Sequence, residues 1–267
     1  MNEKDLSLRK VQAERSQTRI RSGFSHLSKL TAKLMGQKWR GGERWPALLS
    51  QVIDRLKKEY GCPWLGNFHD PIKEIFFILL SARTSEVLYV RAMEKLFEEF
   101  PSHVALAKAD VESIMDCIEG AGLGAKRSRQ VILVAKRLVS DFGRNPAAHL
   151  RTMLPLDVYK YLTSLPGVGP KSAFCVMMWS LDFDVLPVDV NVQRIAARLG
   201  VIPTGLKHYQ AQQRFPRFAP ENRSRELHTV FMVHGRKVCV PGKPKCGECV
   251  VSDLCRTGRK RSGRLSQ

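Results

Sequence analysis

The sequence predicts an all-α protein with short loops, and three observations lead to this fold class. From Trp45 onward, apolar residues recur at the three- and four-residue spacing of an amphipathic helix. Asp, Pro and Gly residues stand where such stretches begin and end, as they do at helix caps. No stretch alternates apolar and polar residues over enough positions to indicate a sheet.

The expected helices follow one another closely along the chain. The first covers WPALLSQVIDRLKKEY and ends at Gly61, and the second has Asp70 as its cap and Pro71 at its first position. A later helix, DVNVQRIAARL, has one apolar stripe and ends at Gly200. The others are EVLYVRAMEKLFEEF, DVESIMDCIE, KRSRQVILVAKRLVSDF, LDVYKYLTSL, PKSAFCVMMWSL and SRELHTVFMVHGRKV.

The charge of the chain indicates the kind of partner it binds. The 267 residues include 44 Lys and Arg against 25 Asp and Glu, which gives a net charge of +19. An excess of this size favours a polyanion, most often nucleic acid, over a surface that is merely basic. Residues 1–45 form a basic arm, and their composition fits either a partly helical segment or a disordered tail.

The apolar runs of the chain are too short to span a membrane. The longest, IFFILLSA, falls far below the roughly 20 residues that a bilayer requires. Glu3 and Asp5, without an apolar stretch beside them, argue against a secretory signal or a transit peptide. We therefore expect an intracellular, cytoplasmic protein associated with the nucleoid, with reduced thiols and no membrane contact.

The stretch LTSLPGVGPKSAF predicts a helix, a tight turn and a second helix. Gly167 and Gly169 allow backbone angles that a Cβ forbids, and Pro170 suits the first position of the second helix. The backbone amides around Val168 lead into a helix N-terminus and make an anion site, for which a duplex phosphate is the natural occupant. The alternative is a plain helical hairpin whose glycines serve packing.

An earlier stretch, GAGLGAKRSRQ, repeats this arrangement in a weaker form. Gly122 and Gly124 precede Lys126 at an expected helix start. The pattern means little by itself, but beside the hairpin it predicts a second phosphate contact.

Lys171 falls in the first turn of the helix after the hairpin, where the positive end of the helix dipole disfavours an ammonium ion. A neutral amine is a nucleophile that forms Schiff bases, whereas a charged lysine would bind phosphate. Asp189 lies 18 positions later, as the expected cap of the next helix. Its carboxylate can also stabilise positive charge on a sugar or relay a proton.

Four of the seven cysteines are grouped near the end of the chain. Cys239, Cys246, Cys249 and Cys255 have the spacing C-x6-C-x2-C-x5-C. Grouped thiols in a reducing compartment indicate a metal site rather than disulfides. Four thiolates can hold a [4Fe–4S] cluster or a zinc ion, but structural zinc sites more often use two short cysteine knuckles, and here there is one.

Taken in order, the motifs ILLSARTSEV, GLGAKRSRQV, LPGVGPKSA, VDVNVQR and the four-cysteine loop resemble the endonuclease III family of helix-hairpin-helix DNA glycosylases. The resemblance covers about residues 45–256. It implies a helix-hairpin-helix glycosylase fold of two helical domains with a cleft between them, a [4Fe–4S] cluster, and double-stranded DNA with a damaged base or an abasic site as partner. It also implies that Lys171 attacks C1′ of a flipped nucleotide and that Asp189 assists.

Two positions depart from the pattern of that family. Arg83 stands where a glutamine commonly fills the space left by the flipped base, and Asn191 replaces a usual histidine. An arginine can still fill the stack, and its charge favours polar contact with the orphaned base. Both positions lie where the damaged base is chosen, so the sequence leaves the preferred lesion open.

These observations predict three parts in the chain. They are the arm at 1–45, a six-helix domain at 66–183 that carries the hairpin, and a cluster domain formed by 46–65 and 184–267. Lys171 and Asp189 are then expected to face each other across the cleft, one from each domain.

The expected function is that of a bifunctional DNA glycosylase and AP lyase of base excision repair, acting as a monomer on oxidised pyrimidines. One alternative is a monofunctional glycosylase that uses water activated by Asp189, against which Lys171 argues. The other is a non-catalytic iron–sulfur DNA-binding protein in which Arg83 and Asn191 mark a lost pocket.

Overall fold

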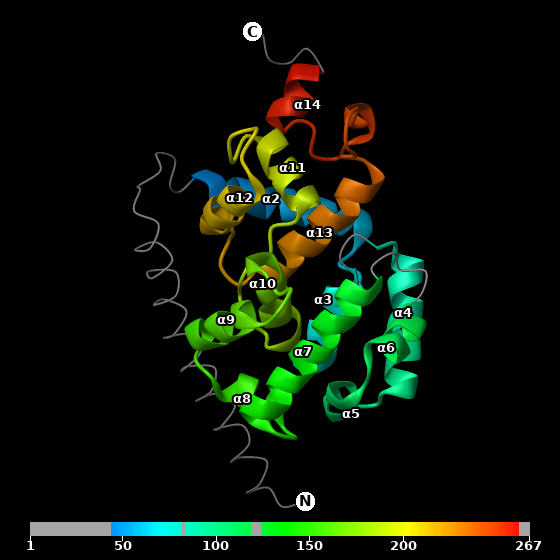
Figure 1. Cartoon of the computed structure of the whole chain (residues 1–267). Helices are drawn as coiled ribbons and strands as arrows, with labels where there is room; N and C mark the ends of the chain where they lie inside the picture. The colour runs from blue at the N-terminus through cyan, green and yellow to red at the C-terminus, as the bar shows by residue number, and fades with distance from the viewer. Residues whose placement is uncertain (1–43, 82–83, 119–123, 262–267) are drawn as a thin grey trace, which may run out of the picture.

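The computed structural model describes residues 44–81, 84–118 and 124–261, and their regular secondary structure is helical throughout (Figure 1). Because no strand occurs among these residues, the predicted all-α fold class is confirmed. The arm predicted at 1–45 lies, except for its last two residues, outside the described part. Within the same described ranges, no helix has both the length and the apolar character that a membrane crossing needs.

The middle of the chain builds the first hydrophobic core around α3. The apolar run IFFILL of α3 is buried, and α3 packs against α4, α7, α8 and α10. A helix that is apolar on nearly every side is stable only at the centre of such a body. The helices of this body are α3 (Pro71–Ser81), α4 (Glu86–Glu99), α5 (His103–Lys108), α6 (Val111–Cys117), α7 (Gly124–Phe142), α8 (Pro146–Thr152), α9 (Pro155–Ser164) and α10 (Pro170–Ser180).

The second core joins the start of the described chain to its end. Here α13 packs against both α2 and α11, and Figure 1 shows these helices together in the other half of the molecule. Its elements are α2 (Arg44–Tyr60), α11 (Val190–Leu199), α12 (His208–Arg214), the 3-10 helix η1 (Phe215–Phe218), α13 (Ser224–Lys237), the 3-10 helix η2 (Cys246–Glu248) and α14 (Arg256–Arg261).

We propose that the two cores mark two domains with the boundaries predicted above, at 66–183 and at 46–65 plus 184–267. The helix content of the first differs from the six helices expected, because the structure adds α5 and α8. With six and seven residues, these two helices are too short to show a repeating apolar stripe, which is why the sequence pattern misses them.

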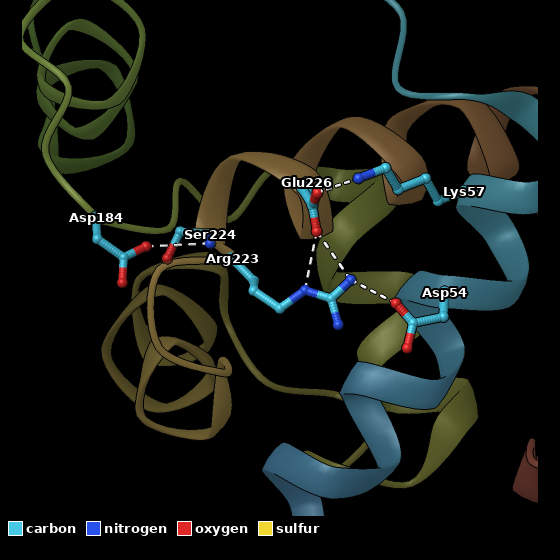
Figure 2. A network of polar contacts seen from close by, with 6 residues as sticks. All are labelled: Asp54, Lys57, Asp184, Arg223, Ser224 and Glu226. Carbon is cyan, nitrogen blue, oxygen red and sulfur yellow. Dashed lines mark hydrogen bonds and ion pairs between the residues drawn. The ribbon is translucent and has the colours of Figure 1, made fainter.

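A network of ion pairs joins α2 to the beginning of α13 (Figure 2). Arg223 donates to Asp54 of α2 at 2.6 Å and to Glu226 at 2.8 Å, and Lys57 of α2 also pairs with Glu226. Exposed ion pairs of this kind each contribute little to stability. They link the side chains of α2 to those at the start of α13, whose packing together belongs to the second core.

Asp184 extends this network to the connection between the two cores (Figure 2). Its carboxylate accepts hydrogen bonds from the backbone amides of Asn222 at 2.6 Å and Ser224 at 3.1 Å, just where α13 begins. A carboxylate at a helix start binds amides that have no partner within the helix. The connection that leads to Asp189 is thereby fixed to the second core.

Candidate active site and nucleic-acid interface

The turn between α9 and α10 has the hairpin geometry that the sequence predicts. Gly167 has a φ of +85°, in the left-handed region that favours glycine, and a Cβ there would lie 2.8 Å from Nε2 of Gln130. Val168 is buried. Gly169 is extended, with a φ of −91°, and Pro170 begins α10. The turn thus leads directly into a helix N-terminus, the place where backbone amides bind anions.

Gly167→Ala is expected to destabilise the hairpin by about 1–3 kcal/mol, because it adds left-handed strain to a close contact. Gly169→Ala is the matched control, since a Cβ at that position meets no atom within 4 Å. Thermal melting of both variants and the wild type measures the difference. If Gly169→Ala keeps the wild-type melting temperature but binds duplex DNA more weakly, the DNA backbone approaches at this glycine. An equal loss of stability in both variants would contradict this account.

Lys171 is half-buried in the first turn of α10, directly after the hairpin. Attraction to the Cys175 sulfur, to which it hydrogen-bonds, and to the Asp189 and Glu74 carboxylates raises the pKa of Lys171, while burial opposes this. Burial also raises the pKa of the Cys175 thiol, an effect that the nearby Lys171 opposes.

The free protein therefore holds Lys171 as an ammonium ion. The Asp189 carboxylate favours this charged form, whereas the positive end of the helix dipole opposes it. A reaction at this lysine must begin by removing a proton.

Asp189 caps α11, as the sequence predicts. Its Oδ1 accepts a hydrogen bond from the backbone amide of Val192 at 2.8 Å, and Nδ2 of Asn191 donates a hydrogen bond to its Oδ2 at 3.2 Å. From this position its charge attracts that of Lys171 in the other core. The nearer acid Asp182 pairs instead with Arg225. Of the acids that follow Lys171 in the sequence, Asp189 is thus the one whose charge acts on the lysine.

Gly124 and Lys126 lie at the start of α7, where the second phosphate contact is predicted. Gly124 has a φ of +30°, and Lys126 is exposed in the first turn. Arg83 and Gly122, the other two residues predicted to contact DNA, lie outside the described residues. Their roles stay predictions.

A chain of hydrogen bonds leads from Asp189 toward the cysteines. Asn191, which binds Asp189, accepts from Arg194 at 2.7 Å, and Arg194 also donates to the carbonyl of Cys239 at 2.9 Å. Arg198, one turn further along α11, donates to Sγ of Cys239 at 3.2 Å. Neither arginine belongs to a motif that marks it in the sequence, although their spacing of four residues places them on one helix face.

The four cysteines of the C-terminal motif line one hollow of about 370 Å³, its open mouth included. Apolar side chains of α11, Ile195 and Leu199, form part of its wall, and Arg198 also lines it. Thiolate sulfurs are the ligands that iron–sulfur groups and zinc prefer, and a donor to a ligand sulfur is a common supporting contact at such sites.

The four cysteine side chains lie around the hollow. Among the described residues, no three His, Cys, Asp or Glu side chains come close enough together to hold a single metal ion. Zinc requires its sulfur ligands at about 2.3 Å from one atom, whereas a cluster distributes its thiolates over several irons. The four-cysteine lining is chemically suited to an iron–sulfur group.

Burial raises the pKa of Cys249 to about 11 and also raises that of Cys255. Both thiols are therefore protonated near neutral pH. Because metals bind thiolates, these protons must leave when the group binds.

Two protein-family models match the chain. Residues 77–220, more than half of its length, match the model described as HhH-GPD superfamily base excision DNA repair protein, and residues 239–255 match the iron–sulfur binding domain of endonuclease III. The chain belongs to the endonuclease III family. The predicted resemblance is thus confirmed, and this endonuclease III-like chain is a protein of base excision DNA repair. The second match begins and ends at the first and last of the four grouped cysteines.

Individual relatives agree with this membership. Endonuclease III of Thermotoga maritima is 30% identical over 193 residues, which cover 72% of this chain and 85% of that one. Endonuclease III of Escherichia coli K12 is 26% identical over 206 residues, 77% of this chain and 93% of that one. A solved non-covalent endonuclease III–DNA complex matches with a TM-score of 0.70 at 21% identity, covering 82% of this endonuclease III-like chain and 98% of that one. The last likeness shows the fold.

Proposed function

We propose that this chain is a bifunctional DNA glycosylase and AP lyase, which removes damaged bases, oxidised pyrimidines above all, and cuts the strand at the abasic site. The observation that carries the proposal is the half-buried amine of Lys171, placed directly after the hairpin turn and attracted to Asp189 of the other core. Double-stranded DNA as the partner is supported by the net charge of +19 and by the hairpin.

The proposed reaction follows from the two side chains. Asp189 takes a proton from the Lys171 ammonium, and the free amine attacks C1′ of a nucleotide flipped out of the duplex. The bond from C1′ to the base breaks, and its electron pair leaves with the base, which takes up a proton. Opening of the sugar ring then gives an imine between Nζ and C1′. Loss of a proton from C2′ expels the 3′ phosphate by β-elimination.

In this proposal, the backbone of Gly167, Val168 and Gly169 binds a duplex phosphate beside the flipped nucleotide. The start of α7, with Gly124 and Lys126, contacts a second phosphate. These contacts hold the strand so that C1′ lies within reach of Lys171.

We further propose that Cys239, Cys246, Cys249 and Cys255 hold a [4Fe–4S] cluster. When bound, the group supplies a cross-link that fixes the loop 239–255 against α11, with Arg198 donating to a ligand sulfur. Through Arg194 and Asn191, the same loop supports the position of Asp189.

Duplexes that carry an abasic site, an oxidised pyrimidine, 8-oxoguanine, uracil or a mismatch test the proposal. We expect the wild-type protein to nick the abasic duplex, to release the oxidised pyrimidine, and to become covalently attached to DNA in the presence of borohydride. Base release without nicking or attachment would indicate a monofunctional glycosylase. Binding without any cleavage would indicate a DNA-binding protein that is not an enzyme.

A further inference from the structure

Glu74 is a buried acid that the proposed reaction does not use. It lies on α3 and is 0% exposed. Its Oε1 accepts from Nδ2 of Asn67 at 2.6 Å, and its Oε2 accepts from the amide of Phe68 at 2.8 Å. Burial raises the pKa of Glu74 from 4.5 to about 8, more than these two neutral donors lower it. A single acid in the run PIKEIFFILL gives no sign of its surroundings, so its burial is not evident from the sequence.

Glu74 belongs to a buried group of titratable side chains around Lys171. The helices α3 and α10 pack together, and the charge of Lys171 acts on Glu74. Cys175 of α10 is 3% exposed, and both Glu74 and Asp189 act on its thiol. His228 of α13 is buried in the same region, where burial lowers its pKa to about 4 and leaves it neutral.

The other helices packed on α3 contribute less charge to this group. Glu94 and Lys95 of α4, Lys126 of α7 and Arg151 of α8 are exposed, and Arg127 of α7 is half-buried. Exposed charges are screened by water and salt, whereas buried charges act on one another strongly. The charged side chain that acts on Glu74 is Lys171.

We propose that Glu74 is a positioning residue for Lys171: once ionised, its buried carboxylate holds the lysine in the ammonium form and so limits imine formation in alkaline solution. This inference rests on the proposed role of Lys171 as the nucleophile. In this role Glu74 influences the pH dependence of the reaction and does not contact DNA.

The direction of the effect follows from when Glu74 carries its charge. Below about pH 8 its carboxyl is protonated and neutral, and it neither attracts nor repels the Lys171 ammonium. Above about pH 8 it ionises and stabilises the ammonium, which raises the pKa of Lys171. The supply of neutral amine therefore rises less steeply with pH than it would beside an uncharged residue.

The initial rate of borohydride trapping on an abasic duplex, measured from pH 6 to pH 9.5, tests the proposal with Glu74→Gln. Glutamine keeps an acceptor for the Phe68 amide but never ionises. We expect trapping by wild type and variant to agree near pH 6.5, and the variant to be about three- to tenfold faster near pH 9. Equal rates at every pH, or a slower variant at high pH, would overturn the proposal.

Two further variants separate this effect from a loss of structure. Glu226→Gln is the matched control, because it removes a carboxylate from the ion pairs between α2 and α13 and should leave the pH profile unchanged (Figure 2). If Glu74→Gln does not fold, Asn67→Ala replaces it. Losing the 2.6 Å donor makes Glu74 harder to ionise, so trapping between pH 8 and pH 9 should still exceed the wild-type rate.

Thermal melting tests the ionisation of Glu74 without using the reaction. The folded carboxyl keeps its proton to about pH 8, while an ordinary glutamate loses it near 4.5. Since the unfolded chain binds fewer protons between these values, the stability of the wild type relative to Glu74→Gln should fall as pH rises from about 5 to about 8. If the stability difference between wild type and Glu74→Gln does not change with pH, Glu74 does not have the raised pKa. Absence of wild-type trapping at every pH would instead reject the proposed function.

Discussion

Lys171→Ala is expected to abolish covalent trapping on abasic DNA, with a loss of roughly a thousandfold or more, because it removes the amine that forms the imine. Binding to an undamaged duplex should change little, because the hairpin amides and the basic surface remain. The measurement is a borohydride trapping gel beside a binding titration at fixed salt. Trapping that survives the substitution would show that another amine, such as the N-terminus or a different lysine, forms the imine.

The matched variant is Asp189→Asn, which separates the chemistry of this residue from its role as a helix cap. Asparagine caps helices about as well as aspartate, so the 2.8 Å bond to the Val192 amide and the melting temperature should be kept. We expect the trapping rate to fall about a hundredfold, since the base that takes the Lys171 proton is lost. If Asp189→Asn traps at the wild-type rate, Asp189 is a structural cap and another group removes the proton.

How much of this site could be predicted from the sequence depends on whether a feature is local. The hairpin turn is set by a short string in which Gly167 needs a left-handed backbone, and its geometry was predictable. The cysteine spacing and the cap at Asp189 are local in the same way. The all-helical fold follows from a repeating pattern along each helix.

Features that depend on how helices pack could not be predicted in this way. The burial of Glu74 behind Lys171 depends on α3 packing against α10, and no pattern in either helix encodes it. Arg198 donates to Cys239, which lies 41 residues later in the chain. The helix dipole is one local influence on the charge of Lys171, but Cys175 of the same helix and two acids from other segments, Glu74 and Asp189, also act on it.

Cys249→Ala is expected to remove the iron–sulfur group and to lower the melting temperature by roughly 10 °C, because metal binding at a structural site contributes directly to folding free energy. The second core depends on this loop, since Cys239, Cys249 and Cys255 pack against it. Iron content and visible absorbance report on the group, and thermal melting reports on the fold.

Cys62→Ala is the control for this variant, because Cys62 is exposed and lies outside the cysteine motif. It should keep the wild-type iron content and melting temperature. Zinc in place of iron in the wild-type protein would overturn the assignment of the group, although the four cysteines would still be its ligands. If Cys249→Ala retains full iron content, the hollow lined by the four thiols is not the binding site. The trapping activity of each variant should fall in proportion to its loss of iron, because the same loop supports Asp189 through Arg194 and Asn191.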